Sequence, residues 1–202
     1  MNNQQQQWAI FLAVHHALRV TYGPAATLWG KGGHCAATAL IGAALTELVT
    51  GLPCQPVSGA GFIFLNDGRR LGYEPSQVDW ERGLYHCFFL AAGVPVDFRL
   101  CLIPDFLRLH LVAHPHRFPL YAWGELPTWL QLQPEEKATY RIQDIYDSLK
   151  QLPIYNSFSQ AAHLVTSGCI PQAGALLGAA CKGFMQHYQQ EYDIAKGYSR
   201  VV

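Results

Sequence analysis

A run of small and apolar residues from Cys35 to Val49 constrains the fold more than any other segment of the chain. Gly51 and Pro53 follow it, and glycine and proline at such positions end a helix. Small residues occupy nearly every face of the predicted helix, whereas a surface helix keeps one polar face. The segment therefore predicts a central helix that is surrounded by the rest of the protein.

The turn before this helix, Lys31-Gly32-Gly33-His34, places Cys35 at the helix start. The first N–H groups of a helix have no intrahelical partner, and together with the helix dipole they stabilise an anion and lower a cysteine pKa. A cysteine in an alanine-rich helix also packs well as a small apolar residue. The turn favours chemistry, because glycine lets the backbone approach a ligand and the Cys35 N–H is free to bind an oxyanion. We therefore expect Cys35 to be a nucleophile.

A base and an acid for this thiol follow in the chain. His86 begins an apolar run, 86–92, that reads as a strand, Gly93 marks a turn, and 94–98 reads as the returning strand with Asp97 in it. With the tip at Ala92 and Gly93, we expect facing residues to have numbers that sum to about 183, a sum that His86 and Asp97 satisfy. The sequence thus predicts His86 and Asp97 as a cross-strand pair, with Cβ atoms about 5 Å apart.

Other periodic segments complete a single predicted domain, 1–202, of the α+β class. Apolar spacing predicts helices, and a turn signal at Asp67 and Gly68 predicts a hairpin with which the sheet starts. The expected architecture is a central helix carrying Cys35 packed on an antiparallel β-sheet, with extra helices toward the C-terminus. The predicted helices are 4–22, 141–150 and 171–190, the hairpin pairs 61–65 with 69–73, and weaker signals lie at 100–112 and 119–123.

Two histidine groups compete for a role at the site. His34 is a secondary candidate for the base, but adjacent helical residues point about 100° apart, so we expect it to shape the pocket instead. His110, His114 and His116 have a spacing that occurs in zinc sites, yet Pro115 interrupts them and they read as exposed loop residues. No metal and no cofactor is expected.

The composition excludes several classes of partner. The formal net charge is zero, which argues against a nucleic-acid partner. Charged residues make up 14% of the chain, against about 25% in a usual domain, and this favours burial of surface in a homodimer. Six scattered cysteines read as free thiols, and neither a signal sequence nor a membrane-spanning run is apparent. We expect a cytoplasmic protein with no membrane partner.

The ordered set of Cys35 after its glycine turn, His86 and Asp97 resembles the papain-like cysteine proteinase superfamily, and within it the transglutaminase-like branch that includes arylamine N-acetyltransferases. Those acetyltransferases carry an Arg-Gly-Gly-aromatic-Cys turn, in which Lys31 and His34 stand here at the arginine and aromatic positions. The chain as a whole resembles an uncharacterised bacterial domain family of that superfamily.

This resemblance implies a papain-like fold and a thiol-dependent acyl transfer. Cys35 would be the nucleophile, His86 the general base and acid, and Asp97 the group that orients the imidazole. A cysteine peptidase or amidase acting on a peptide or small-molecule amide is the leading expectation. Trp29 stands where papain has a glutamine that binds the oxyanion, so Trp29, Gly33 and His34 are the candidate oxyanion or pocket residues. The alternatives are an acyltransferase to a small amine and a catalytically inactive binding or assembly scaffold.

Overall fold

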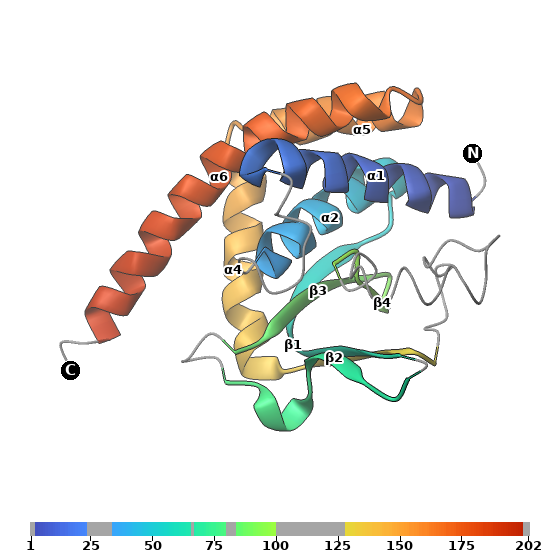
Figure 1. Ribbon diagram of the computed structural model, residues 1–202. Helices are drawn as coiled ribbons and strands as arrows, with labels where there is room; N and C mark the ends of the chain where they lie inside the picture. The colour runs from blue at the N-terminus through green and yellow to red at the C-terminus, as the bar shows by residue number, and fades with distance from the viewer. Residues whose placement is uncertain (1–2, 24–33, 66, 80–83, 100–127, 200–202) are drawn as a thin grey trace.

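The computed structural model describes residues 3–23, 34–65, 67–79, 84–99 and 128–199 (Figure 1). This part of the chain is an α+β structure in which helices cover an antiparallel sheet. The helices are α1 (Asn3–Tyr22), α2 (Cys35–Thr50), α4 (Glu136–Gln151), α5 (Tyr155–Thr166) and α6 (Ile170–Ser199), with a short 3-10 helix, η2 (Pro75–Gln77). The strands are β1 (Cys54–Phe64), β2 (Arg70–Tyr73), β3 (His86–Ala91), β4 (Val94–Val96) and β5 (Leu130–Pro134).

Helix α2 is the centre of the structure. Every residue from Ala36 to Thr46 is buried, as the small side chains on all its faces predict. Figure 1 shows α2 between the sheet and the helices α1, α5 and α6. The helix ends at Gly51, whose φ of 72° is left-handed and whose N–H bonds to the Glu47 carbonyl. The prediction of a central helix over 35–49 is confirmed.

Strand β1 organises the sheet. Its first part, 54–59, pairs with β3, its second part pairs with β2 over 61–64, and β5 pairs with it over 59–63, all antiparallel. The predicted hairpin to β2 is present, but the strand begins at Cys54 rather than at Gly61. Proline, serine and glycine weaken the strand signal in this segment. The absence of a side chain at Gly59 is needed for packing, since a Cβ there would lie 2.2 Å from the Gln133 carbonyl oxygen of β5.

The terminal helices pack against each other over α2 (Figure 1). Helix α1 has the predicted extent, and Thr21 donates from it to the Gly178 carbonyl of α6 at 2.9 Å. A Cβ on Gly174 would lie 2.6 Å from His16, so glycine allows the two helices this close approach. Helices α4 and α6 are longer than predicted, and α5 and β5 were not predicted at all.

Glu47 joins three elements at one end of α2. Its carboxylate accepts the Cys54 N–H of β1 at 3.1 Å, the Tyr146 hydroxyl of α4 at 3.3 Å and the Lys150 ammonium of α4 at 2.9 Å. Both ends of the ion pair with Lys150 are about one-third exposed, while Tyr146 is fully buried. These bonds fix α4 against the end of α2 that lies away from Cys35.

Some of the sequence predictions fall outside the described residues, namely the strand signals at 100–112 and 119–123 and the histidines 110, 114 and 116.

None of the helices described combines the length and apolarity needed to cross a membrane.

Candidate active site

Cys35 is the first residue of α2 and keeps partial contact with solvent. The Thr38 N–H and hydroxyl both bond to the His34 carbonyl, at 2.9 and 2.7 Å, so the helical hydrogen bonds begin at His34. The Cys35 N–H therefore belongs to the first turn, where backbone N–H groups have no intrahelical partner. The thiol stands at the positive end of a helix whose next eleven residues are buried.

His86 begins β3 and is 1% exposed. It lies opposite Gly59 in the ladder between β1 and β3. Gly61, two residues further along β1, makes room for the imidazole, since a Cβ there would lie only 2.5 Å from His86 Cδ2. Gly61 therefore leaves the space on the sheet that the buried imidazole occupies.

Asp97 follows the last residue of β4 and binds the imidazole. Its Oδ2 lies 2.5 Å from Nε2 of His86, and its Oδ1 accepts the Arg99 N–H at 2.7 Å. Both carboxylate oxygens are therefore held, and the Nε2 proton of His86 is directed at Asp97. The imidazole also hydrogen-bonds to the Cys35 thiol.

The register between these strands differs from the prediction. Phe89 pairs with Val96, so facing residues sum to 185 rather than 183. The two-residue loop lies where the sequence places it, at Ala92 and Gly93, and both residues have the positive φ that such tight hairpins require. A loop at these two residues gives a sum of 185, so the expected sum of 183 was wrong by two. Because the shift is by an even number, the predicted pair remains on one side of the strands and meets diagonally.

Phe98 anchors the short segment that carries Asp97. Its ring makes edge contacts with Phe89 of β3, at 5.4 Å between ring centroids, and with Phe11 of α1, at 5.6 Å. The same ring lies against Gly42 of α2, where a Cβ would come within 3.2 Å. The acid of the site is therefore fixed between the sheet and both N-terminal helices.

Cys35 hydrogen-bonds to two consecutive residues of β3, His86 and Cys87. Cys87 contributes both its thiol and its backbone N–H. The Ala92 N–H donates to the carbonyl of Pro53, the residue before β1, so the alternation of the ladder directs the N–H of Cys87 away from β1. Strand β4 pairs only with 89–91, which leaves that N–H available to the sulfur of Cys35.

These contacts change the protonation of both reacting groups. The hydrogen bond from the Cys87 thiol, with the hydrogen bond and positive charge of His86, holds the pKa of Cys35 well below its usual 9.0, although burial acts in the opposite direction. Burial disfavours the charged imidazole, but the Asp97 carboxylate and the Cys35 sulfur outweigh it and raise the pKa of His86 to about 10. Both shifts favour the pair of a Cys35 thiolate and a His86 imidazolium over the pair of neutral groups.

Arg99 adds a buried positive charge to this neighbourhood. It is 4% exposed, and burial lowers its pKa while the charges of Cys35 and Asp97 act in the opposite direction. Burial and Arg99 also lower the pKa of His34, which stacks on Tyr22 with ring centroids 4.2 Å apart. His34 therefore lies beside the site as a stacked ring, and the hydrogen bond to Cys35 comes from His86.

The remaining candidates are placed as follows. Trp29 and Gly33 lie outside the described residues, so their predicted roles rest on the sequence.

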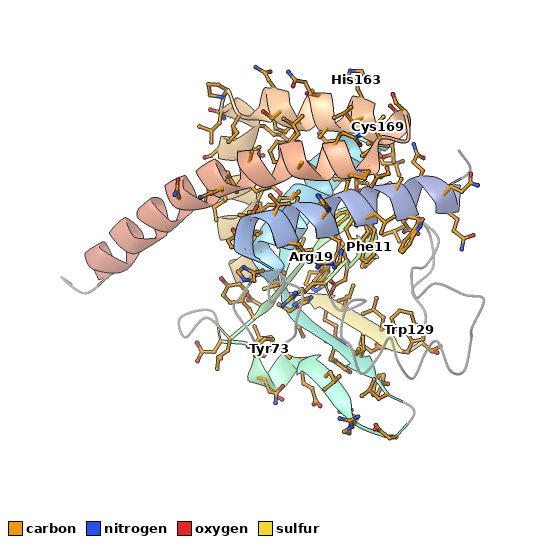
Figure 2. The ribbon with its side chains drawn as sticks, turned by 45° about the horizontal axis from the view of Figure 1, so that its top comes forward. Phe11, Arg19, Tyr73, Trp129, His163 and Cys169 are labelled. Atoms are coloured by element: carbon orange, nitrogen blue, oxygen red, sulfur yellow. The ribbon has the colours of Figure 1, made fainter. Side chains whose placement is uncertain are left out.

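His163 and Cys169 lie on the outer helical layer, at α5 and in the turn before α6, away from the sheet (Figure 2). Within the ranges described, no group of three or more histidine, cysteine, aspartate or glutamate side chains is arranged to hold a metal ion.

Two residues of the site, Cys87 and Arg99, are not among those predicted from the sequence. Neighbouring residues of a strand point to opposite faces, so the position next to His86 argued against Cys87. Arg99 carried a usable signal, because a charge two residues after the predicted acid, in an apolar segment, is often buried with a partner.

No family model and no curated protein sequence matches the chain. A solved structure titled "The crystal structure of genomics APC5867" is similar to it, with a TM-score of 0.50, 14% sequence identity, and coverage of 80% of this chain and 78% of that chain. At this identity the likeness concerns the fold alone, and it supports the α+β arrangement over most of the chain.

Proposed function

We propose that the chain is a thiol-dependent acyl-transfer enzyme, a cysteine peptidase or amidase with a papain-like fold of the transglutaminase-like branch. One observation carries the proposal: the Cys35 thiol at a helix start, the His86 imidazole and the Asp97 carboxylate form one connected chain of hydrogen bonds. Their order along the sequence, with a nucleophile on a helix and a base and acid on the sheet that follows, supports this branch.

Acylation would begin with the thiolate. The Cys35 sulfur attacks the carbonyl carbon of an amide, a C–S bond forms, and the Cys35 N–H at the helix start donates to the oxyanion. The C–N bond then breaks as Nδ1 of His86 gives its proton to the departing amine. Asp97 keeps the imidazole in the orientation that directs Nδ1 at the thiol and the leaving group.

Deacylation reverses these roles. Nδ1 of His86, now neutral, takes a proton from water, and the resulting hydroxide attacks the thioester carbonyl. The C–S bond breaks, the carboxylic acid leaves, and Cys35 returns as the thiolate beside a protonated His86. Attack by a small amine in place of water would make the same site an acyltransferase.

The test is the pH dependence of iodoacetamide alkylation at each cysteine, read by mass spectrometry on the wild type, His86→Ala and His34→Ala. We expect Cys35 to react at a lower pH than the other thiols, to lose this advantage in His86→Ala and to keep it in His34→Ala. Cys54 is an internal comparison, because burial and Glu47 raise its pKa to about 12. Equal loss in both variants, or an unreactive Cys35, would overturn the assignment and favour a scaffold.

Substrate screening follows with peptides, simple amides and thioesters. We expect an acyl-enzyme at Cys35 that mass spectrometry detects and that water resolves. An acyl-enzyme formed from acyl-CoA but not from peptides, and released only by an amine, would instead indicate the acyltransferase.

A further inference from the structure

A second sulfur atom lies against the nucleophile and has no part in the acyl transfer described above. Cys87 hydrogen-bonds to Cys35 through its thiol, and it is 1% exposed. Cys35 comes from the start of α2 and Cys87 from β3, so the contact joins segments far apart in the sequence. Two thiols in contact, one activated and one buried, are the components of a reversible disulfide.

Cys87 is held in position from its other side. Ser58 lies directly opposite it in the ladder between β1 and β3, and the Ser58 hydroxyl oxygen is 3.1 Å from the Cys87 sulfur. Ser58 is fully buried. The Cys87 thiol is thus fixed between a buried hydroxyl and the Cys35 sulfur, and it cannot turn away from the site without losing both contacts.

The two thiols differ in exposure. Cys35 as a whole residue is partly exposed, whereas Cys87 is 1% exposed, so we expect a small oxidant to reach Cys35 first. Burial and the neighbouring Cys35 raise the pKa of Cys87 well above its usual value, which keeps it a thiol. This asymmetry assigns Cys35 as the thiol that is oxidised and Cys87 as the thiol that resolves the product.

We propose that Cys35 and Cys87 form a reversible disulfide when a hydroperoxide oxidises the nucleophile, and that this disulfide protects the enzyme in an inactive form. The inference rests on the proposed function in one respect, since it requires Cys35 to be a reactive thiolate.

The chemistry balances in two steps. The Cys35 thiolate attacks one oxygen of hydrogen peroxide, the O–O bond breaks, and a sulfenic acid and hydroxide form. The Cys87 sulfur then attacks the sulfenic sulfur, the S–O bond breaks, and the departing hydroxide takes the Cys87 proton as water. The two thiols have lost two electrons to the peroxide, and two equivalents of a reducing thiol restore them.

The experiment treats the full chain with hydrogen peroxide and maps every cysteine by mass spectrometry before and after dithiothreitol. In the wild type we expect peptides containing Cys35 and Cys87 to be cross-linked with the loss of two hydrogens. Alkylation of Cys35 should stop and then return fully after reduction. Cys181→Ala, which removes another buried thiol, is the matched control and should behave as the wild type does.

Removal of Cys87 should change the product, and it should also slow the first step, because the Cys87 hydrogen bond stabilises the Cys35 thiolate. In Cys87→Ala we expect Cys35 to proceed to sulfinic and sulfonic acid, with at least about a tenfold loss of the alkylation that dithiothreitol recovers. Cys87→Ser keeps a hydrogen-bonding group beside Ser58, and should give the same result if the alanine variant does not fold.

A second probe measures the contact without an oxidant. Phenylarsine oxide bridges two neighbouring thiols, so one equivalent should block Cys35 in the wild type and be removed only by a dithiol. In Cys87→Ser the block should be weak and reversed by a monothiol.

The outcomes separate this inference from the proposed function. Over-oxidation of wild-type Cys35 without a cross-link, with normal alkylation of the reduced thiol at low pH, would overturn the disulfide and leave the proposed function standing. A Cys35 that reacts with neither iodoacetamide nor peroxide would overturn both.

Discussion

The Nε2 atom of His86 lies 2.5 Å from Oδ2 of Asp97, and both side chains are 1% exposed. A carboxylate and an imidazole in this contact form a hydrogen bond away from solvent, so the charge of one controls the protonation of the other. The effect passes to Cys35 through the other nitrogen of the ring. Changes at Asp97 should therefore be visible as changes in thiol reactivity.

Asp97→Asn should lower the pKa of His86 from about 10, because the Asp97 charge is the foremost of the interactions that raise it. The imidazolium then no longer stabilises the thiolate, and alkylation of Cys35 near neutral pH should slow by about tenfold for each unit that its pKa rises. Asp67→Asn, which removes an exposed carboxylate paired with Arg69, is the control and should leave the rate unchanged. An unchanged rate in Asp97→Asn would contradict this coupling.

Gly61→Ala should displace the imidazole and leave the fold intact. The added methyl group would lie 2.5 Å from His86 Cδ2, and the ring must shift out of line with Asp97 or Cys35. We expect Cys35 to lose most of its reactivity at low pH, by about tenfold or more. In Gly183→Ala the new methyl group meets only the end of the Ile154 side chain at 3.2 Å, so circular dichroism and alkylation should match the wild type.

The contact between His86 and Asp97 was predicted from the sequence, although the register expected for their two strands was wrong by two residues. A sum of 183 and a sum of 185 have the same parity, and in a sheet parity decides on which face a side chain lies. Cys87 was not predicted, because strand alternation places it on the face opposite to that of His86. Contact with a helix terminus at the end of a strand does not follow strand alternation, and only the three-dimensional position of α2 shows that consecutive residues of β3 meet Cys35.

The elements that were not predicted differ in how clearly their sequences indicate a helix or a strand. Strand β5 alternates Leu130, Gln131, Leu132 and Gln133, the two-residue period of a half-buried strand. Helix α5 buries Phe158, Ala161, Ala162 and Val165, which is helical spacing. The start of β1 has no such signal, because its proline, serine and glycines have low strand propensity. Their small size allows β1 to pack closely against β3 and β5.

Arg99→Met should raise the pKa of Cys35 by less than His86→Ala does. The guanidinium charge acts on Cys35 and Asp97, while the hydrogen bonds of Cys87 and His86 dominate at the thiol. The Arg99 backbone N–H still binds Asp97, so the acid keeps its position. Alkylation rates against pH measure the shift, and Arg19→Met, at an exposed position of α1, is the control. A shift as large as that of His86→Ala would show that Arg99 positions the whole site.

Glu47→Ala should destabilise the fold without changing Cys35. It leaves the Cys54 N–H and the Tyr146 hydroxyl without their acceptor, which costs about 1–3 kcal/mol of unfolding free energy. Lys150→Met removes only a partly exposed ion pair and should cost about 0–1 kcal/mol. Urea unfolding measures both. A loss of Cys35 reactivity in Glu47→Ala under folded conditions would show that the two ends of α2 are coupled.

The thiolate and the imidazolium should give the free energy of unfolding a characteristic dependence on pH. The pKa of His86 is raised from 6.5 to about 10, so its contribution is full below pH 6.5 and is lost as the pH rises to about 10. The pKa of Cys35 is lowered from 9.0, so its contribution is full above pH 9.0 and is lost as the pH falls. Between pH 6.5 and 9.0 the two slopes have opposite signs, and they cancel wherever folded Cys35 is a thiolate, because the folded and unfolded chains then bind the same number of protons.

We therefore expect a plateau when the unfolding free energy of the double variant Cys35→Ser, His86→Gln is subtracted from that of the wild type. The glutamine keeps a donor for Asp97, so the difference isolates the charged pair. The curve should be flat from pH 6.5 to 9.0 and fall on either side, with a slope of about 1.4 kcal/mol per pH unit on the acid side. Urea titrations from about pH 5 to about pH 10 measure it. A difference that stays constant below pH 6.5 would mean that Cys35 is a neutral thiol in the folded protein, and the acyl-transfer mechanism would lose its nucleophile.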